Sequence, residues 1–98
     1  HYTPEIRIDC PDSKKKDVIE QVVSKFMRYR ENANAPYHIG NLNTIDGIRV
    51  VFDQGWGLVR SSNTQPVVVM RVEAEDERSM EDYKMFLEKE FAEAMETI

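Results

Sequence analysis

Residues 46–60 read DGIRVVFDQGWGLVR, and this stretch decides the fold. Its Asp-Gly start predicts a tight hairpin turn, because both residues tolerate positive φ. The residues that follow alternate so that Ile48, Val50 and Phe52 share one face, as in a half-buried strand. A Gln-Gly pair then turns the chain again, and a second short strand runs up to Arg60. Two antiparallel strands joined by tight turns are therefore expected in the middle of the chain.

Strand patterns also flank this centre. Residues 39–45 precede it and residues 67–73 follow it, and the latter are apolar on both faces at their start. Such a run is typical of a strand that has neighbours on both sides. Residues 3–10 open the chain with a polar–apolar alternation that predicts a further strand. Because hairpin links join most of these segments, we expect a mostly antiparallel sheet.

Two amphipathic helices complete the predicted fold. The first follows residues 11–13, where an Asp or Ser oxygen can cap it, and the second follows a cap within residues 76–79. Their apolar stripes consist of Val18, Ile19, Val22, Val23, Phe26 and Met27 in the first helix and of Tyr83, Phe86, Leu87, Phe91, Ala94 and Met95 in the second. The order β-α-β-β-β-β-α predicts an α+β domain whose two helices cover one face of the sheet.

Length, charge and cysteine content exclude several classes of protein. Ninety-eight residues make a single domain, 1–98, and 18 acidic against 13 basic residues give a net charge of −5. Such a chain lacks the basic field that nucleic acid or an anionic membrane would require. The chain has no long apolar run and no signal-peptide pattern at its start. The single cysteine, Cys10, excludes an internal disulfide and fits a cytoplasmic protein.

A polar loop after the central strands carries the strongest chemical signal. Residues 60–66 read RSSNTQP. The Arg60 guanidinium offers a planar fork of donors that fits phosphate oxygens, and the Ser, Asn and Thr side chains add short neutral donors. Backbone N–H groups of a tight turn can converge on the same anion. The pattern indicates a metal-free phosphate site, although the same residue types also serve as ordinary turn formers.

Other polar residues give weaker signals. Trp56 could stack on a sugar or a base or serve as a core or rim residue, and Cys10 is interpreted as a small buried hydrophobe. Residues 14–16 form a Lys-Lys-Lys triplet that is interpreted as a solvated helix face, so Lys15→Ala is expected to change little. His38 has no acidic or cysteine partner at ligand spacing. We therefore expect no metal site and no catalytic acid–base pair in this chain.

Three motifs in succession resemble one enzyme family. Residues 46–50 read DGIRV, residues 55–66 read GWGLVRSSNTQP and residues 71–74 read RVEA. Together they are similar to the C-terminal domain of the α-D-phosphohexomutases, in particular the bacterial phosphomannomutase/phosphoglucomutase branch, whose loop typically reads R-x-S-N-T-x-P. The resemblance runs over nearly the whole chain. It implies a TATA-binding-protein-like β-α-β(4)-α fold, which is the order that the periodicity predicts.

The resemblance also implies a role for the loop. Enzymes of this family interconvert hexose 1-phosphates and hexose 6-phosphates through a bisphosphorylated intermediate, using a phosphoserine beside a magnesium ion. Their C-terminal domain grips the phosphate that is not being transferred. Matched by position, Arg60, Ser62, Asn63 and Thr64 would bind this phosphate, while the other polar loop residues fall at variable positions.

The catalytic loops of the family are not found in this sequence. Its phosphoserine loop, magnesium loop and sugar loop belong to upstream domains, so the resemblance implies a domain that is inactive alone and binds no cofactor itself. Residues 1–4 would then be a hinge. The expected partners are a phosphorylated hexose and the upstream domains of the same polypeptide. The alternative is a stand-alone α+β binding or regulatory module for another anionic small molecule.

Overall fold

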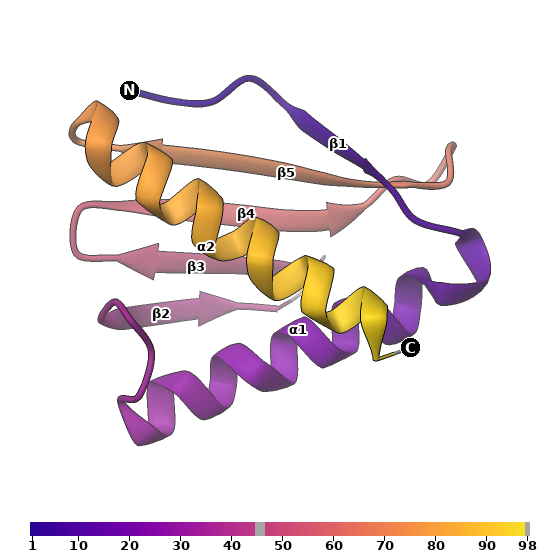
Figure 1. The fold of residues 1–98 in the computed structure, drawn as a ribbon, viewed down its shortest axis with the longest axis horizontal. Helices are drawn as coiled ribbons and strands as arrows, with labels where there is room; N and C mark the ends of the chain where they lie inside the picture. The colour runs from indigo at the N-terminus through magenta and orange to yellow at the C-terminus, as the bar shows by residue number, and fades with distance from the viewer. Residues whose placement is uncertain (45–46, 98) are drawn as a thin grey trace.

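The computed structural model describes residues 1–44 and 47–97, and within them the chain forms five strands and two helices (Figure 1). In chain order these are β1 (Ile6–Asp9), α1 (Asp12–Asn32), β2 (Ile39–Asn43), β3 (Ile48–Phe52), β4 (Gly55–Ser61), β5 (Val67–Ala74) and α2 (Glu77–Glu96). The sheet has the strand order β1-β5-β4-β3-β2, and every pair is antiparallel. The expected α+β, β-α-β(4)-α fold is confirmed, with β5 inside the sheet. Ile45 and Asp46, which fall in the expected second strand and turn, lie outside the described residues.

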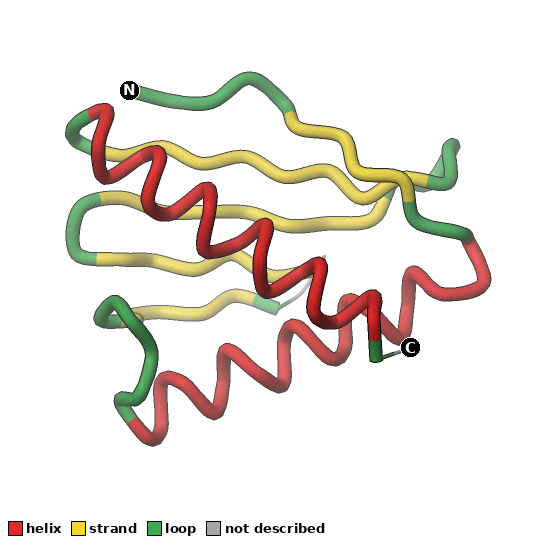
Figure 2. The backbone as a smooth tube through the Cα atoms, in the orientation of Figure 1, coloured by secondary structure: helices red, strands yellow, loops and turns green. Residues whose placement is uncertain are grey.

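Both helices pack on the same face of the sheet, as predicted (Figure 2). Strand residues that point toward the helices are buried, and Val50 is 0% exposed, whereas its neighbour Arg49 is exposed. This difference follows from the period of two along a strand. The opposite face, called the open face below, carries Trp56, Leu58 and Arg60 together on β4 and is covered by neither helix. The sequence predicted this grouping.

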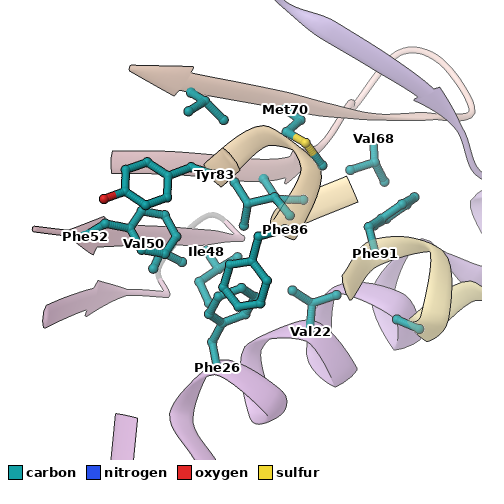
Figure 3. Packing of buried hydrophobic residues seen from close by; sticks show 14 of the residues in the cluster. Val22, Phe26, Ile48, Val50, Phe52, Val68, Met70, Tyr83, Phe86 and Phe91 are labelled. Atoms are coloured by element: carbon teal, nitrogen blue, oxygen red, sulfur yellow. The ribbon is translucent and has the colours of Figure 1, made fainter. Parts of the chain in front are cut away.

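Aliphatic side chains and a group of aromatic rings fill the core between the helices and the sheet (Figure 3). Phe26 of α1 and Phe86 of α2 meet edge to face with ring centroids 5.4 Å apart. Phe52 of β3 stacks on Tyr83 of α2 at 4.1 Å. The Tyr83 hydroxyl accepts a hydrogen bond of 3.1 Å from the Gln54 N–H, so its polar end is satisfied. This packing anchors β3 and β4 and thereby fixes the strand that carries the candidate loop.

The two helices begin differently. Asp76 caps α2 as predicted, because its carboxylate accepts a hydrogen bond of 2.7 Å from the Ser79 N–H. The expected Asp or Ser side-chain cap of α1 is wrong: Pro11 occupies the N-cap position, and no side chain caps the helix there. Asp12 lies inside the first turn instead, where its carboxylate pairs with Lys15 at 2.7 Å. Its negative charge also suits the positive end of the helix dipole.

The first residues of the chain are hydrogen-bonded along β5. The Thr3 N–H donates to the Val72 carbonyl at 2.8 Å, and the Val72 N–H donates to Thr3 Oγ1 at 3.1 Å. The Ala74 N–H donates to the His1 carbonyl at 2.9 Å. Only Ile6–Asp9 has regular strand geometry, so β1 is shorter than expected. A hinge in the first four residues stays a prediction.

Candidate phosphate-binding site

The loop between β4 and β5 is closed by its own hydrogen bonds. The Ser62 N–H donates to the Val67 carbonyl at 3.1 Å, and the Val67 N–H donates to the Gln65 carbonyl at 2.8 Å. Ser62 Oγ accepts a hydrogen bond of 3.3 Å from the Thr64 N–H, and the two hydroxyl oxygens lie 3.4 Å apart. The loop is therefore a short turn that holds two hydroxyl groups next to each other.

Arg60 lies where β4 enters this loop, on the open face of the sheet. It is directly opposite Val69 of β5, and its side chain is exposed. Within residues 1–44 and 47–97, the Arg60 guanidinium has no hydrogen-bond or ion-pair partner, and the same holds for the backbone N–H groups of Asn63 and Gln65. The five N–H donors of a guanidinium and two backbone donors are thus available to an anion.

A cavity of about 360 Å³ brings the predicted ligands together. Arg60, Ser62, Asn63 and Thr64 all line it. The other lining residues are Glu5, Arg7, Ser61, Gln65 and Val69. All four residues that the loop motif predicts therefore surround one space, and most of its other lining is polar as well.

A second, larger cavity lies on the helix side of the loop, with a volume of about 900 Å³. It includes only Arg60 and Asn63 of the four predicted ligands. Two carboxylates, those of Asp12 and Glu20, also line it. Lys15 and Lys16 line it as well, so charge alone does not distinguish the two cavities. The smaller cavity on the open face is the better candidate because it contains all four predicted ligands.

Lys15 holds the loop from the helix side. Its Nζ donates to the carbonyl oxygen of Ser62 at 2.7 Å and to that of Gln65. The Lys15 side chain is only 11% exposed, so the expectation of a solvated face is wrong for this residue, although its two neighbours in the triplet are exposed. The cause is topological: β1 pairs with β5, which brings the start of α1 beside the loop that precedes β5 (Figure 1). A hydrogen bond of 2.8 Å from the Cys10 N–H to the Pro66 carbonyl strengthens this junction.

Gly47 supports the backbone of Arg60 from the neighbouring hairpin. Its φ of 109° is the positive value that the Asp-Gly motif predicts. A Cβ at this position would lie 2.3 Å from the Val59 carbonyl oxygen and 2.9 Å from the Arg60 Cα. Only glycine allows so close an approach at this dihedral angle.

Trp56 is a rim residue of the open face and lies outside the loop cavity. Its Nε1 donates to Glu73 Oε2 at 2.9 Å, and the Arg49 guanidinium lies 4.6 Å from the ring centroid. Arg49 therefore covers the ring through a cation–π contact. Of the roles considered for Trp56, the rim position is confirmed, and stacking on a sugar stays a prediction.

The remaining chemically reactive residues lie away from the loop or are buried. Cys10 is 1% exposed, as predicted, and burial raises the pKa of its thiol, which disfavours the reactive thiolate. His38 has an acidic partner that its sequence neighbours do not reveal: its Nδ1 lies 2.8 Å from Asp53 Oδ1, at the opposite end of the strands from the loop. Among the described residues, no group of three or more His, Cys, Asp or Glu side chains is placed to hold a metal ion. No helix in the described part of the chain is long and apolar enough to cross a membrane.

Comparison with known protein families decides the relationship. The model of the family described as "Phosphoglucomutase/phosphomannomutase, C-terminal domain" matches residues 5–90, which include the whole candidate loop. The chain belongs to this family. The resemblance carried by the three motifs is thereby confirmed.

Individual relatives agree with this assignment. The phosphomannomutase/phosphoglucomutase of Pseudomonas aeruginosa is 42% identical over 82 residues, which are 84% of this chain and 16% of the relative. The phosphoglucomutase of Neisseria gonorrhoeae is 41% identical over 80 residues, which are 81% of this chain and 16% of the relative. A crystal structure of a phosphoglucomutase/phosphomannomutase family protein from Burkholderia thailandensis has a TM-score of 0.70 at 29% identity, over 97% of this chain and 18% of that one. The chain thus spans only a small part of the length of these relatives.

Proposed function

We propose that this domain binds the phosphate that is not being transferred in a phosphomannomutase/phosphoglucomutase, an isomerase that interconverts hexose 1-phosphates and hexose 6-phosphates. One observation carries the proposal: the Arg60 guanidinium shares a single cavity with the side chains of Ser62, Asn63 and Thr64. The names of the relatives support a hexose phosphate as the substrate class. The loop itself supplies the donors that a phosphate requires.

A loop that recognises only a phosphate suits a reaction in which a bisphosphorylated sugar turns around. Either end of such an intermediate presents the same chemical group, so one site can hold both orientations and can accept glucose or mannose alike. Binding at a phosphate remote from the reacting one lowers the barrier by fixing the position of the sugar. Closure of the domain over the sugar would also exclude water from the activated phosphoryl group.

The phosphoryl transfer itself is assigned to other parts of a longer enzyme. A magnesium ion and a phosphoserine are expected in upstream domains of that enzyme. The partners of this domain would be the phosphorylated hexose and those upstream domains. The chain alone is expected to bind the phosphosugar and to show no mutase activity.

Binding of glucose 1-phosphate to this chain tests the proposal. Because a single domain supplies only part of the contacts, we expect a dissociation constant in the millimolar range, or about −4 kcal/mol. Arg60→Ala should raise this constant about tenfold, since it removes charged hydrogen bonds to the phosphate. The fold should be retained because the side chain is exposed. Arg28→Ala, an exposed arginine on α1, is the matched control, and Arg60→Ala binding with wild-type affinity would overturn the proposal.

A further inference from the structure

Val69 of β5 lies between two arginines on the open face of the sheet. Arg7 of β1 is directly opposite Val69 on one side, and Arg60 of β4 is directly opposite it on the other. Residues paired across antiparallel strands point to the same face. Neighbouring strands lie about 4.8 Å apart, so the Cα atoms of the two arginines are separated by about 9.6 Å. Two long side chains at this separation can reach one anion placed above Val69.

Arg7 also lines the cavity of about 360 Å³ that contains Arg60 and the loop side chains. Its ion pair is loose: Arg7 Nη1 lies 3.6 Å from Glu5 Oε1, and the two side chains are 50% and 38% exposed. This separation is too long for a hydrogen bond, and an exposed pair of this kind contributes little. The Arg7 guanidinium can therefore reorient toward a phosphate at little energetic cost, because the ion pair with Glu5 that it would lose is weak.

From this placement we propose that Arg7 is a second guanidinium ligand of the phosphate that the loop binds. The inference rests on the proposed function and deepens it, because two guanidinium groups favour a phosphate that carries two negative charges. Each fork can form two parallel hydrogen bonds to phosphate oxygens. A monoanion such as acetate offers fewer oxygens and half the charge, so it gains less from the second arginine.

Glu5 is the group that opposes this arrangement. Its carboxylate lines the same cavity and is the present partner of Arg7. A bound phosphate would be repelled by this negative charge and would compete with it for Arg7. Removing the charge while keeping the shape, as in Glu5→Gln, should therefore tighten phosphate binding.

The experiment follows the arginine Nε–Hε signals of the chain by ¹H–¹⁵N NMR during titration with inorganic phosphate, glucose 1-phosphate and acetate. The Arg7 and Arg60 signals are assigned by their loss in Arg7→Ala and Arg60→Ala. Both signals should move with the same dissociation constant for the two phosphates, and acetate should move them far less. Arg7→Ala should raise the phosphate dissociation constant about threefold to fivefold, Glu5→Gln should lower it, and Arg28→Ala should leave it unchanged.

The outcomes separate this inference from the proposed function. If the Arg60 signal moves, the Arg7 signal stays, and Arg7→Ala binds phosphate as the wild type does, then Arg7 is no ligand and the proposed function stands. If neither signal moves and Arg60→Ala behaves as the wild type, both proposals fail. The amide spectrum of each variant shows whether the fold is intact. Arg7→Gln, which keeps much of the side-chain volume, repeats the test should Arg7→Ala disturb β1.

Discussion

Lys15 Nζ lies 2.7 Å from the carbonyl oxygen of Ser62 and also donates to the carbonyl of Gln65. One ammonium group on α1 thus bridges two backbone oxygens of the candidate loop. A carbonyl bound in this way fixes the orientation of the peptide group that carries the next N–H. Lys15 therefore orients the Ser62–Asn63 peptide, which carries the Asn63 N–H, and also holds the Gln65–Pro66 peptide, which has no N–H to offer. It is not itself a phosphate ligand in this arrangement.

Lys15→Met should loosen the loop while α1 stays helical. Loss of two charged hydrogen bonds at a largely buried site, together with the ion pair to Asp12, should lower the free energy of unfolding by about 1–3 kcal/mol. Amide hydrogen exchange of Asn63, Thr64 and Gln65 should become faster, and the dissociation constant for glucose 1-phosphate should rise. Lys14→Met, at an exposed neighbour, is the control and should change neither. Wild-type exchange rates and affinity in Lys15→Met would contradict the bridging role.

Gly47→Ala should impair both stability and phosphate binding. The added Cβ would clash with the Val59 carbonyl oxygen and press on the Arg60 Cα, at a φ of 109° that other residues avoid. We expect the free energy of unfolding to fall by about 1–3 kcal/mol. Chemical denaturation measures this loss, and phosphate titration of the folded fraction measures the displacement of Arg60. A variant as stable as the wild type would show that the hairpin relaxes freely.

Lys25→Met should destabilise the domain by leaving a buried carboxylate without its cation. Glu90 is 3% exposed, and its Oε2 lies 2.6 Å from Lys25 Nζ, while its Oε1 accepts a hydrogen bond of 3.0 Å from the Tyr29 hydroxyl. We expect the free energy of unfolding to fall by about 1–3 kcal/mol. The expected loss is moderate because the Lys25 side chain is itself partly exposed to water. Lys89→Met, whose ion pair with Glu93 is 3.9 Å long and exposed, should cost little. Equal effects of the two substitutions would contradict this reading.

The same cluster predicts a dependence of stability on pH. The hydrogen bond from Lys25 lowers the pKa of Glu93. A carboxyl with a lowered folded-state pKa stabilises the fold above its unfolded pKa, about 4.3, and this contribution disappears as the pH falls through the folded value. The wild type should therefore be more stable than Glu93→Gln at pH 7, and the difference should shrink below about pH 4. Urea unfolding of both proteins between pH 7 and pH 3 measures this difference in the free energy of unfolding. A difference that does not change with pH would contradict the proposed contribution of Glu93 ionisation to stability.

The strand faces and the grouping of the loop side chains around one cavity could be predicted from the sequence because both are local. A period of two places Val50 inward and Arg49 outward wherever the strand pairs, and a hairpin loop keeps Ser62, Asn63 and Thr64 together whatever surrounds it. The Gly47 dihedral angle follows from the same short-range logic. These features need no knowledge of which strands are neighbours.

The support around the loop could not be predicted because it depends on strand order. Three consecutive lysines look alike in the sequence, and only the pairing of β1 with β5 brings the middle one, Lys15, beside the loop. The same pairing places Arg7 across Val69 from Arg60. The N-cap of α1 was predicted wrongly for a local reason, because Pro11 occupies the N-cap position that Asp or Ser was expected to fill.

The most direct test of phosphate binding at residues 60–66 is an amide chemical-shift titration of this chain with glucose 1-phosphate, with unphosphorylated glucose as the control. Shifts centred on residues 60–66 that appear with glucose 1-phosphate and not with glucose are the predicted result. Equal shifts with both sugars would contradict recognition of the phosphate. Shifts centred elsewhere, or none at tens of millimolar ligand, would contradict the assignment of the site to this loop.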